Sequence, residues 1–188
     1  MMSSDPPRRP HGIANRQRRT RPRPRDVRAL LDHVLDEEGD RRPVEVAFVG
    51  ERTIRRLNRD WMGEDRPTDV LSFPFGEPLP GEPPEAATPA GDVIICVPVC
   101  ERAAAARRIP LDREIARMLI HGTLHLLGYD HATARQAARM RPRERRAMAW
   151  YRRQGLCVME EAAAAGPRSR PAGAARPARQ RHGGRSRA

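Results

Sequence analysis

Two periods of apolar residues alternate along the middle of the chain, one helical and one extended. Spacings of three and four residues predict helices over residues 26–38, 51–61, 99–108, 113–127 and 132–154. Apolar alternation and short β-branched runs predict strands over residues 43–49, 69–75 and 92–97. Together these segments predict one folded domain over residues 26–160, a usual size for a single hydrophobic core.

Individual residues refine the ends of these elements. Asp26 and Asp112 stand where a helix N-cap is expected, and Pro142 is expected to break or kink the last helix. Pro74 indicates that the strand 69–75 lies at an edge of its sheet, because proline has no N–H to donate.

Two elements are predicted to be more buried than the rest. Apolar residues cover almost the whole circumference of the helix 113–127, and such a helix belongs in the core. The strand 92–97 is a continuous, mostly β-branched run, which predicts a position inside the sheet. A Pro- and Gly-rich loop over residues 76–90 precedes it.

The net charge of +12 belongs to the two ends of the chain. Residues 1–25 carry eight Arg and one Asp, and residues 162–188 carry seven Arg and no acid, which leaves −2 for residues 26–161. Because both ends also lack apolar periodicity, we expect disordered basic tails over residues 1–25 and 161–188. Such tails either attract RNA phosphates or reflect composition alone, since all 36 basic residues are Arg.

Composition and cysteine usage predict a cytoplasmic protein without a membrane partner. No run approaches the roughly 20 apolar residues of a membrane-spanning helix, and the N-terminus lacks the apolar core of a secretory signal. The three cysteines are odd in number and lack a Cys-x-x-Cys spacing, so we expect them to be reduced. They are Cys96, Cys100 and Cys157.

Candidate chemistry is concentrated in residues 121–131, His-Gly-Thr-Leu-His-Leu-Leu-Gly-Tyr-Asp-His. His121 and His125 lie one helical turn apart, so their imidazoles project from one face and can bind one ion. Gly128 suits a helix end and a chain reversal, which brings His131 back as a third ligand. Three histidines with an open fourth position are typical of a catalytic zinc site, although nickel and cobalt suit the same ligands. The alternative, three structural histidines, is disfavoured by the cost of burying unpaired imidazoles.

The residue after the first histidine separates this segment from the zinc peptidases of the same spacing. Metzincin peptidases carry His-Glu-x-x-His-x-x-Gly-x-x-His, and the glutamate serves them as general base. This chain has Gly122 at that position. A peptidase is therefore not expected, and a hydrolase of another small substrate, peptides included, is the weakest of the hypotheses.

The segment 121–131 closely resembles the signature of the YbeY family of bacterial rRNA maturation factors and endoribonucleases. Two more blocks occur in the family's order: Pro-Thr-Asp-Val-Leu-Ser-Phe-Pro at 67–74 and Gly-Asp-Val-Ile-Ile at 91–95. The resemblance covers about residues 26–158. It implies an α+β domain in which a small mixed β-sheet packs on a central metal-bearing helix.

The resemblance also implies an activity, ligands and partners. It implies a metal-dependent endoribonuclease, specific for single-stranded RNA, in 16S rRNA 3′-end maturation and ribosome quality control. The family's metal ligands map onto His121, His125 and His131, with one zinc ion (Zn²⁺) expected per chain. The implied partners are single-stranded rRNA at the 16S 3′ end and the small ribosomal subunit.

Further catalytic residues are only candidates. Ser72, in the block 67–74, is expected to face the site. Asp130 either hydrogen-bonds a ligand imidazole or has a capping or surface role. Many family members have Arg where this chain has Met62. Arg59 or Arg66 is the candidate replacement for that cation.

Met62 is the main support for a second hypothesis, a non-catalytic, RNA-binding ribosome-assembly factor with a structural metal. The scarcity of acids directly after His131 is a second departure from the relatives. Trp61 is expected to cover the core or to stack on a base. Asp69 is expected to hold the loop before its strand or to act near the cleft, and Asp92 to be structural.

Overall fold

The computed structural model describes residues 10–76 and 88–161. The expectations for residues 1–9, 77–87 and 162–188 lie outside the described residues. The helices in the described part are α1 (Pro24–Glu37), α2 (Glu51–Met62), α3 (Val97–Arg107), α4 (Leu111–Leu126) and α5 (Ala134–Gln154). The strands are β1 (Gly12–Asn15), β2 (Thr20–Pro22), β3 (Val44–Val49), β4 (Val70–Pro74), β5 (Gly91–Cys96) and β6 (Met159–Glu161).

The main sheet is mixed and has the order β1-β3-β5-β4. β1, β3 and β5 run parallel, and β4 pairs antiparallel with β5. The apolar strand β5 therefore lies inside the sheet, as the sequence predicts. β4 forms an edge of the sheet. Pro74 stands at the end of this strand, where the missing N–H of proline costs the sheet no hydrogen bond between strands.

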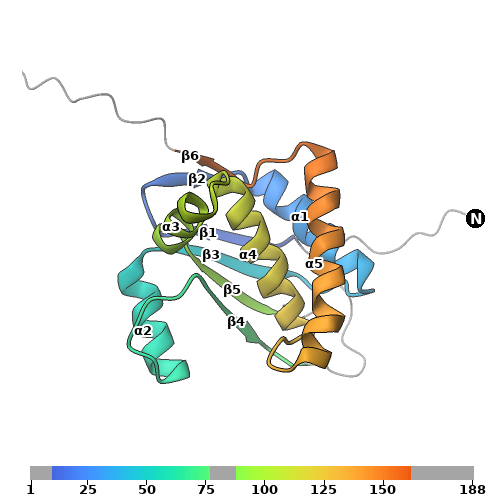
Figure 1. Cartoon of the computed structure of the whole chain (residues 1–188), viewed down its shortest axis with the longest axis horizontal. Coiled ribbons are helices and arrows are strands. Elements are labelled where there is room, and N and C mark those ends of the chain that lie inside the picture. The colour runs from blue at the N-terminus through green and yellow to red at the C-terminus, as the bar shows by residue number, and fades with distance from the viewer. Residues whose placement is uncertain (1–9, 77–87, 162–188) are drawn as a thin grey trace, which may run out of the picture.

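Helices cover both faces of this sheet. α4 packs on β4 and β5 and is surrounded by α1, α3 and α5, which together form the larger core. α2 covers the opposite face, where a smaller cluster is built around Ile54, Leu71 and Cys96. Figure 1 shows α4 in the middle of the molecule, with α5 running beside it. The α+β fold with a small mixed sheet on a central helix is confirmed.

The expected disorder of residues 1–25 is wrong for the residues from 12 onward. β1 pairs with β3 at the edge of the main sheet, and β2 pairs with β6, the last strand of the described residues. His11 is buried, and its Nδ1 accepts the main-chain N–H of Val44 at 2.9 Å. Main-chain pairing with distant strands orders this segment. Such pairing requires no periodic pattern of apolar residues, so the sequence does not reveal it.

Two helix starts and one helix interior also differ from expectation. α1 begins after Arg23 with Pro24 in its first turn, and the Asp26 carboxylate instead accepts the N–H of Cys157 at 3.1 Å. Pro110, and not Asp112, occupies the N-cap position of α4, without a side-chain hydrogen bond. α5 continues through Pro142 without a break.

Candidate metal centre

Three histidines converge at the C-terminal end of α4. The Nε2 atoms of His121 and His125 are 3.1 Å apart, close to the roughly 3.3 Å that separates two nitrogens bound to one tetrahedral zinc. Gly128 takes a positive φ of 80° after the helix, which only a residue without Cβ adopts easily. The turn brings the His131 ring within 5.2 Å of His121 and 5.1 Å of His125, measured between ring centroids.

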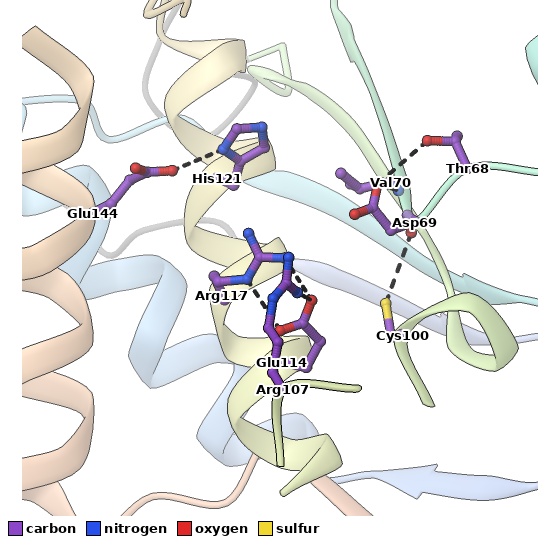
Figure 2. A network of polar contacts seen from close by, with 9 residues as sticks. All are labelled: Thr68, Asp69, Val70, Cys100, Arg107, Glu114, Arg117, His121 and Glu144. Atoms are coloured by element: carbon purple, nitrogen blue, oxygen red, sulfur yellow. Dashed lines mark hydrogen bonds and ion pairs between the residues drawn. The ribbon is translucent and has the colours of Figure 1, made fainter. Parts of the chain in front are cut away.

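The ligand atoms of these three side chains lie within 4.8 Å of one another, so the cluster can hold a metal ion. The donor set fits a metal because the Nδ1 atom of His121 lies 2.8 Å from Oε1 of Glu144. A carboxylate accepts hydrogen bonds, so the proton of a neutral His121 sits on Nδ1 and the lone pair on Nε2 points at the other histidines. Figure 2 shows this contact from α5 to α4.

Glu144 is the functional residue that the sequence reasoning missed. It lies 23 residues from His121 on an Arg-rich helix, where a single carboxylate does not stand out. One signal was present. Glu144 falls on the same stripe of α5 as the buried residues Met140, Ala147 and Tyr151, and a charge on a buried stripe requires a partner.

The electrostatics of the cluster favour a neutral imidazole at His125. Burial lowers the pKa of His125, and the neighbouring His121 and His131 lower it further. The hydrogen bond from His121 holds the pKa of Glu144 below its ordinary value despite partial burial. Neutral nitrogens and an ionised carboxylate are the states that metal binding requires.

An open cavity of about 430 Å³ lies between the three histidines and strand β4. Its wall on the strand side consists of Thr68, Asp69, Val70, Leu71, Ser72 and Pro74. Ser72 thus faces the histidines across the cavity, at the position expected from the sequence. The cavity lies beside β4, the edge strand of the sheet.

Gly122 explains why helix and sheet meet so closely at this point. A Cβ atom added there would lie 2.7 Å from Cγ1 of Val93 and 2.9 Å from Oγ of Ser72. Both distances are shorter than side-chain carbons tolerate, so the helix packs directly on β4 and β5 through this glycine. The same packing excludes a glutamate, and with it the general base of the peptidases that share the histidine spacing.

The remaining candidates lie outside the cavity. Arg59 pairs with Asp60 and Arg66 with Glu64, and neither arginine belongs to the cavity wall. Asp130 accepts the main-chain N–H of His131 at 2.7 Å. Of its two expected roles, the structure therefore places it in the turn.

Residues around the cavity hold β4 in position. The Asp69 carboxylate accepts the N–H of Val70 at 2.9 Å, and its main-chain oxygen accepts the N–H of Cys96 at 2.8 Å. Figure 2 shows Asp69 and Thr68 on the strand side and Cys100 of α3 beneath them. Trp61 packs edge-to-face on Phe73 of β4, with ring centroids 5.8 Å apart, at the border of the smaller core cluster. Trp61 and Met62 are 70% and 50% exposed, and neither belongs to the cavity wall.

Within the described residues, no helix is long and apolar enough to cross a membrane.

Known proteins resemble this chain in sequence and fold. The family model described as endoribonuclease YbeY matches residues 12–152. A protein of that name from Halorhodospira halophila is 48% identical over 123 residues, which are 65% of this chain and 79% of the relative. One from Chromohalobacter salexigens is 44% identical over 128 residues, 67% of this chain and 80% of the relative.

A solution structure from Thermotoga maritima shares the fold, with a TM-score of 0.50 and 24% identity. The match covers 76% of this chain and 92% of that structure. The family-model match spans the metal centre, the cavity wall and most of the elements that support them. The chain belongs to the YbeY family.

Proposed function

We propose that this protein is a metal-dependent endoribonuclease that cleaves single-stranded RNA. The observation that carries the proposal is the convergence of three imidazoles on an open cavity beside an edge strand. Membership of a family whose members are named endoribonuclease supports RNA as the substrate. The lack of space for a glutamate at Gly122 argues against peptide hydrolysis.

The ion is zinc, one per chain, held by His121, His125 and His131. Three nitrogen donors with an open fourth side suit a catalytic zinc site. When bound, zinc supplies Lewis-acid stabilisation of charge that develops on a phosphodiester oxygen. Glu144 keeps the proton of His121 on Nδ1, and Ser72 lines the opposite wall of the cavity.

The RNA is the 3′ end of 16S rRNA in the small ribosomal subunit, in the cytoplasm. The family match supports this substrate. The Arg-rich ends of the sequence, each with a net charge of +7, support attraction to RNA phosphates independently of base sequence.

A second candidate function is a non-catalytic ribosome-assembly factor with a structural metal. It is favoured by one observation: no arginine belongs to the described cavity wall. Met62 stands where the family resemblance implies an arginine, and Arg59 and Arg66 lie outside that wall. The two functions differ in whether RNA is cut, so one set of samples separates them.

Substituting His125→Ala tests the metal and the activity together. Zinc content and cleavage of a single-stranded RNA carrying the 16S 3′ end are measured on the full chain. We expect one zinc per wild-type chain and a variant that loses the zinc and cleaves at least roughly 100-fold more slowly, because the ion contributes several kcal/mol to the transition state. His33→Ala is the matched control, since His33 stacks on Trp150 outside the cavity.

Equal cleavage by the wild type and His125→Ala would refute metal dependence. If the zinc-loaded wild type binds the RNA without cutting it, the assembly-factor function is correct and the endoribonuclease is not.

A further inference from the structure

Adjacent residues of α5 contact two different parts of the metal centre. Glu144 hydrogen-bonds the Nδ1 atom of His121 from across the α4–α5 interface, at 2.8 Å. Its neighbour Arg143 turns the other way along α5. The Nε atom of Arg143 donates to both carboxylate oxygens of Glu38, at 2.9 and 3.1 Å, at the end of α1.

Tyr129 joins these two charged side chains to the turn that carries His131. The phenol O–H donates to Oε2 of Glu38 at 2.6 Å, and the Arg143 guanidinium lies 4.5 Å from the centre of the Tyr129 ring. Glu38, Tyr129 and Arg143 thus form one group of side chains from α1, the turn and α5, which we call the Tyr129 clamp.

His131 needs such support more than the other two histidines do. His121 and His125 project from a buried helix, whereas His131 is exposed and follows the turn after α4. An unanchored turn must be ordered when an ion binds, and that ordering costs conformational entropy. The clamp fixes the chain two residues before His131, so much of this cost is met when the protein folds.

Arg143 itself is held firmly. Its Nη1 atom donates to the main-chain oxygen of Arg139 at 2.9 Å. Pro142 lies in the same turn of α5 and removes one helical N–H donor. The side-chain bond supports the helix beside this proline and limits the positions that the guanidinium can take.

We propose that α5 positions two of the three metal ligands, through Glu144 for the ring of His121 and through the Tyr129 clamp for the turn of His131. Glu38, Tyr129, Arg143 and Glu144 are positioning residues and touch no substrate. The proposal rests on the proposed metal site. The support that the Tyr129 clamp gives to the turn is also present in the metal-free protein.

The structure supplies a matched control for the clamp. Arg146 pairs with Glu37 at 3.0 Å and joins the same two helices, α5 and α1, close beside the clamp. This pair is more exposed, and neither partner contacts Tyr129. Arg146→Ala therefore removes a comparable ion pair without loosening the turn.

The first measurement is zinc affinity by competition with a chelator, on the full chain. We expect Tyr129→Phe and Glu144→Gln each to weaken zinc binding roughly 10- to 100-fold, the usual effect of removing a group that orients a metal ligand. Tyr129→Phe keeps the ring under Arg143 and loses only the hydrogen bond. Arg146→Ala is expected to bind zinc as the wild type does.

The second measurement is amide hydrogen exchange over residues 128–131 in the metal-free proteins. We expect faster exchange in Tyr129→Phe and wild-type exchange in Arg146→Ala. If Tyr129→Phe and Glu144→Gln retain wild-type zinc affinity and Tyr129→Phe retains wild-type exchange, positioning by α5 is refuted while the endoribonuclease proposal stands. If the wild type binds no zinc but Tyr129→Phe speeds exchange, the proposed metal function fails and the clamp on the turn is upheld.

Discussion

Gly122 combines a packing role with a chemical consequence. The glycine lets α4 approach β4 and β5 more closely than any side chain would allow, with Val93 and Ser72 directly opposite. Close approach brings His121 and His125 near the wall of the cavity that Ser72 lines. The absence of a peptidase base is thus a property of the packing as well as of the chemistry.

Gly122→Ala is predicted to lower the free energy of unfolding by about 1–3 kcal/mol, because an added methyl overpacks the contact. Helix propensity alone would raise it by about 1 kcal/mol, so the sign separates the two effects. Urea unfolding of the metal-free protein measures it.

The double variant with Val93→Ala is the internal control, since it removes the Cγ1 atom in the way. Its loss of stability should be smaller than the sum of the two single losses. A neutral or stabilising Gly122→Ala would show that the helix can move away from the sheet at no cost.

At the scale of elements, the N-terminal segment is part of the fold. β1 extends the sheet beside β3, and β2 and β6 form a second, two-stranded sheet. His11 anchors the segment, because it is 3% exposed and accepts the N–H of Val44.

His11→Ala is predicted to lower the free energy of unfolding by about 1–3 kcal/mol, the cost of leaving a buried N–H without its acceptor. Denaturant unfolding checks this. Arg18→Ala in the same segment removes an exposed side chain and should change stability by less than about 0.5 kcal/mol. Wild-type stability in both variants would mean that the segment is a tail after all.

For the molecule as a whole, one buried carboxylate joins two helices of the core. Glu114 is fully buried and pairs with Arg117 of α4 and Arg107 of α3, as Figure 2 shows. Burial alone would raise the pKa of Glu114, but the hydrogen bonds and charges of the two arginines hold it below the ordinary value. The contribution of Glu114 to stability is therefore present above pH 4.5, the ordinary value. It is lost as the pH falls through the lowered one.

Glu114→Gln is predicted to lower the free energy of unfolding at pH 7 by about 1.5–3 kcal/mol, because two partly exposed arginines lose their charged hydrogen-bond acceptor. The difference from wild type should shrink below pH 4.5. Unfolding curves at several pH values measure it. Glu37→Gln, in an exposed ion pair, should follow the wild type throughout, and an equal loss there would point to net charge instead of the buried pair.

The sequence alone determined whatever depends on residues close together in the chain. Helical spacing marked the helices, β-branched runs and Pro74 marked the inner and edge strands, and residues 121–131 marked the histidine cluster and the family. These features are local, since three histidines on one helix and its turn need only the helical period and Gly128 to meet.

The tertiary structure decided what depends on distant segments. Glu144, the Tyr129 clamp and β1 gain their roles from neighbours 23 to 105 residues away, and no local period records such pairings. Arg59 and Arg66 pair with acids one and two residues away, Asp60 and Glu64. Their absence from the cavity wall follows from the packing of α2 on the opposite face of the sheet. Local spacing sets which side chains share a face, whereas packing of α5 and β4 against α4 decides which of them reach the metal centre.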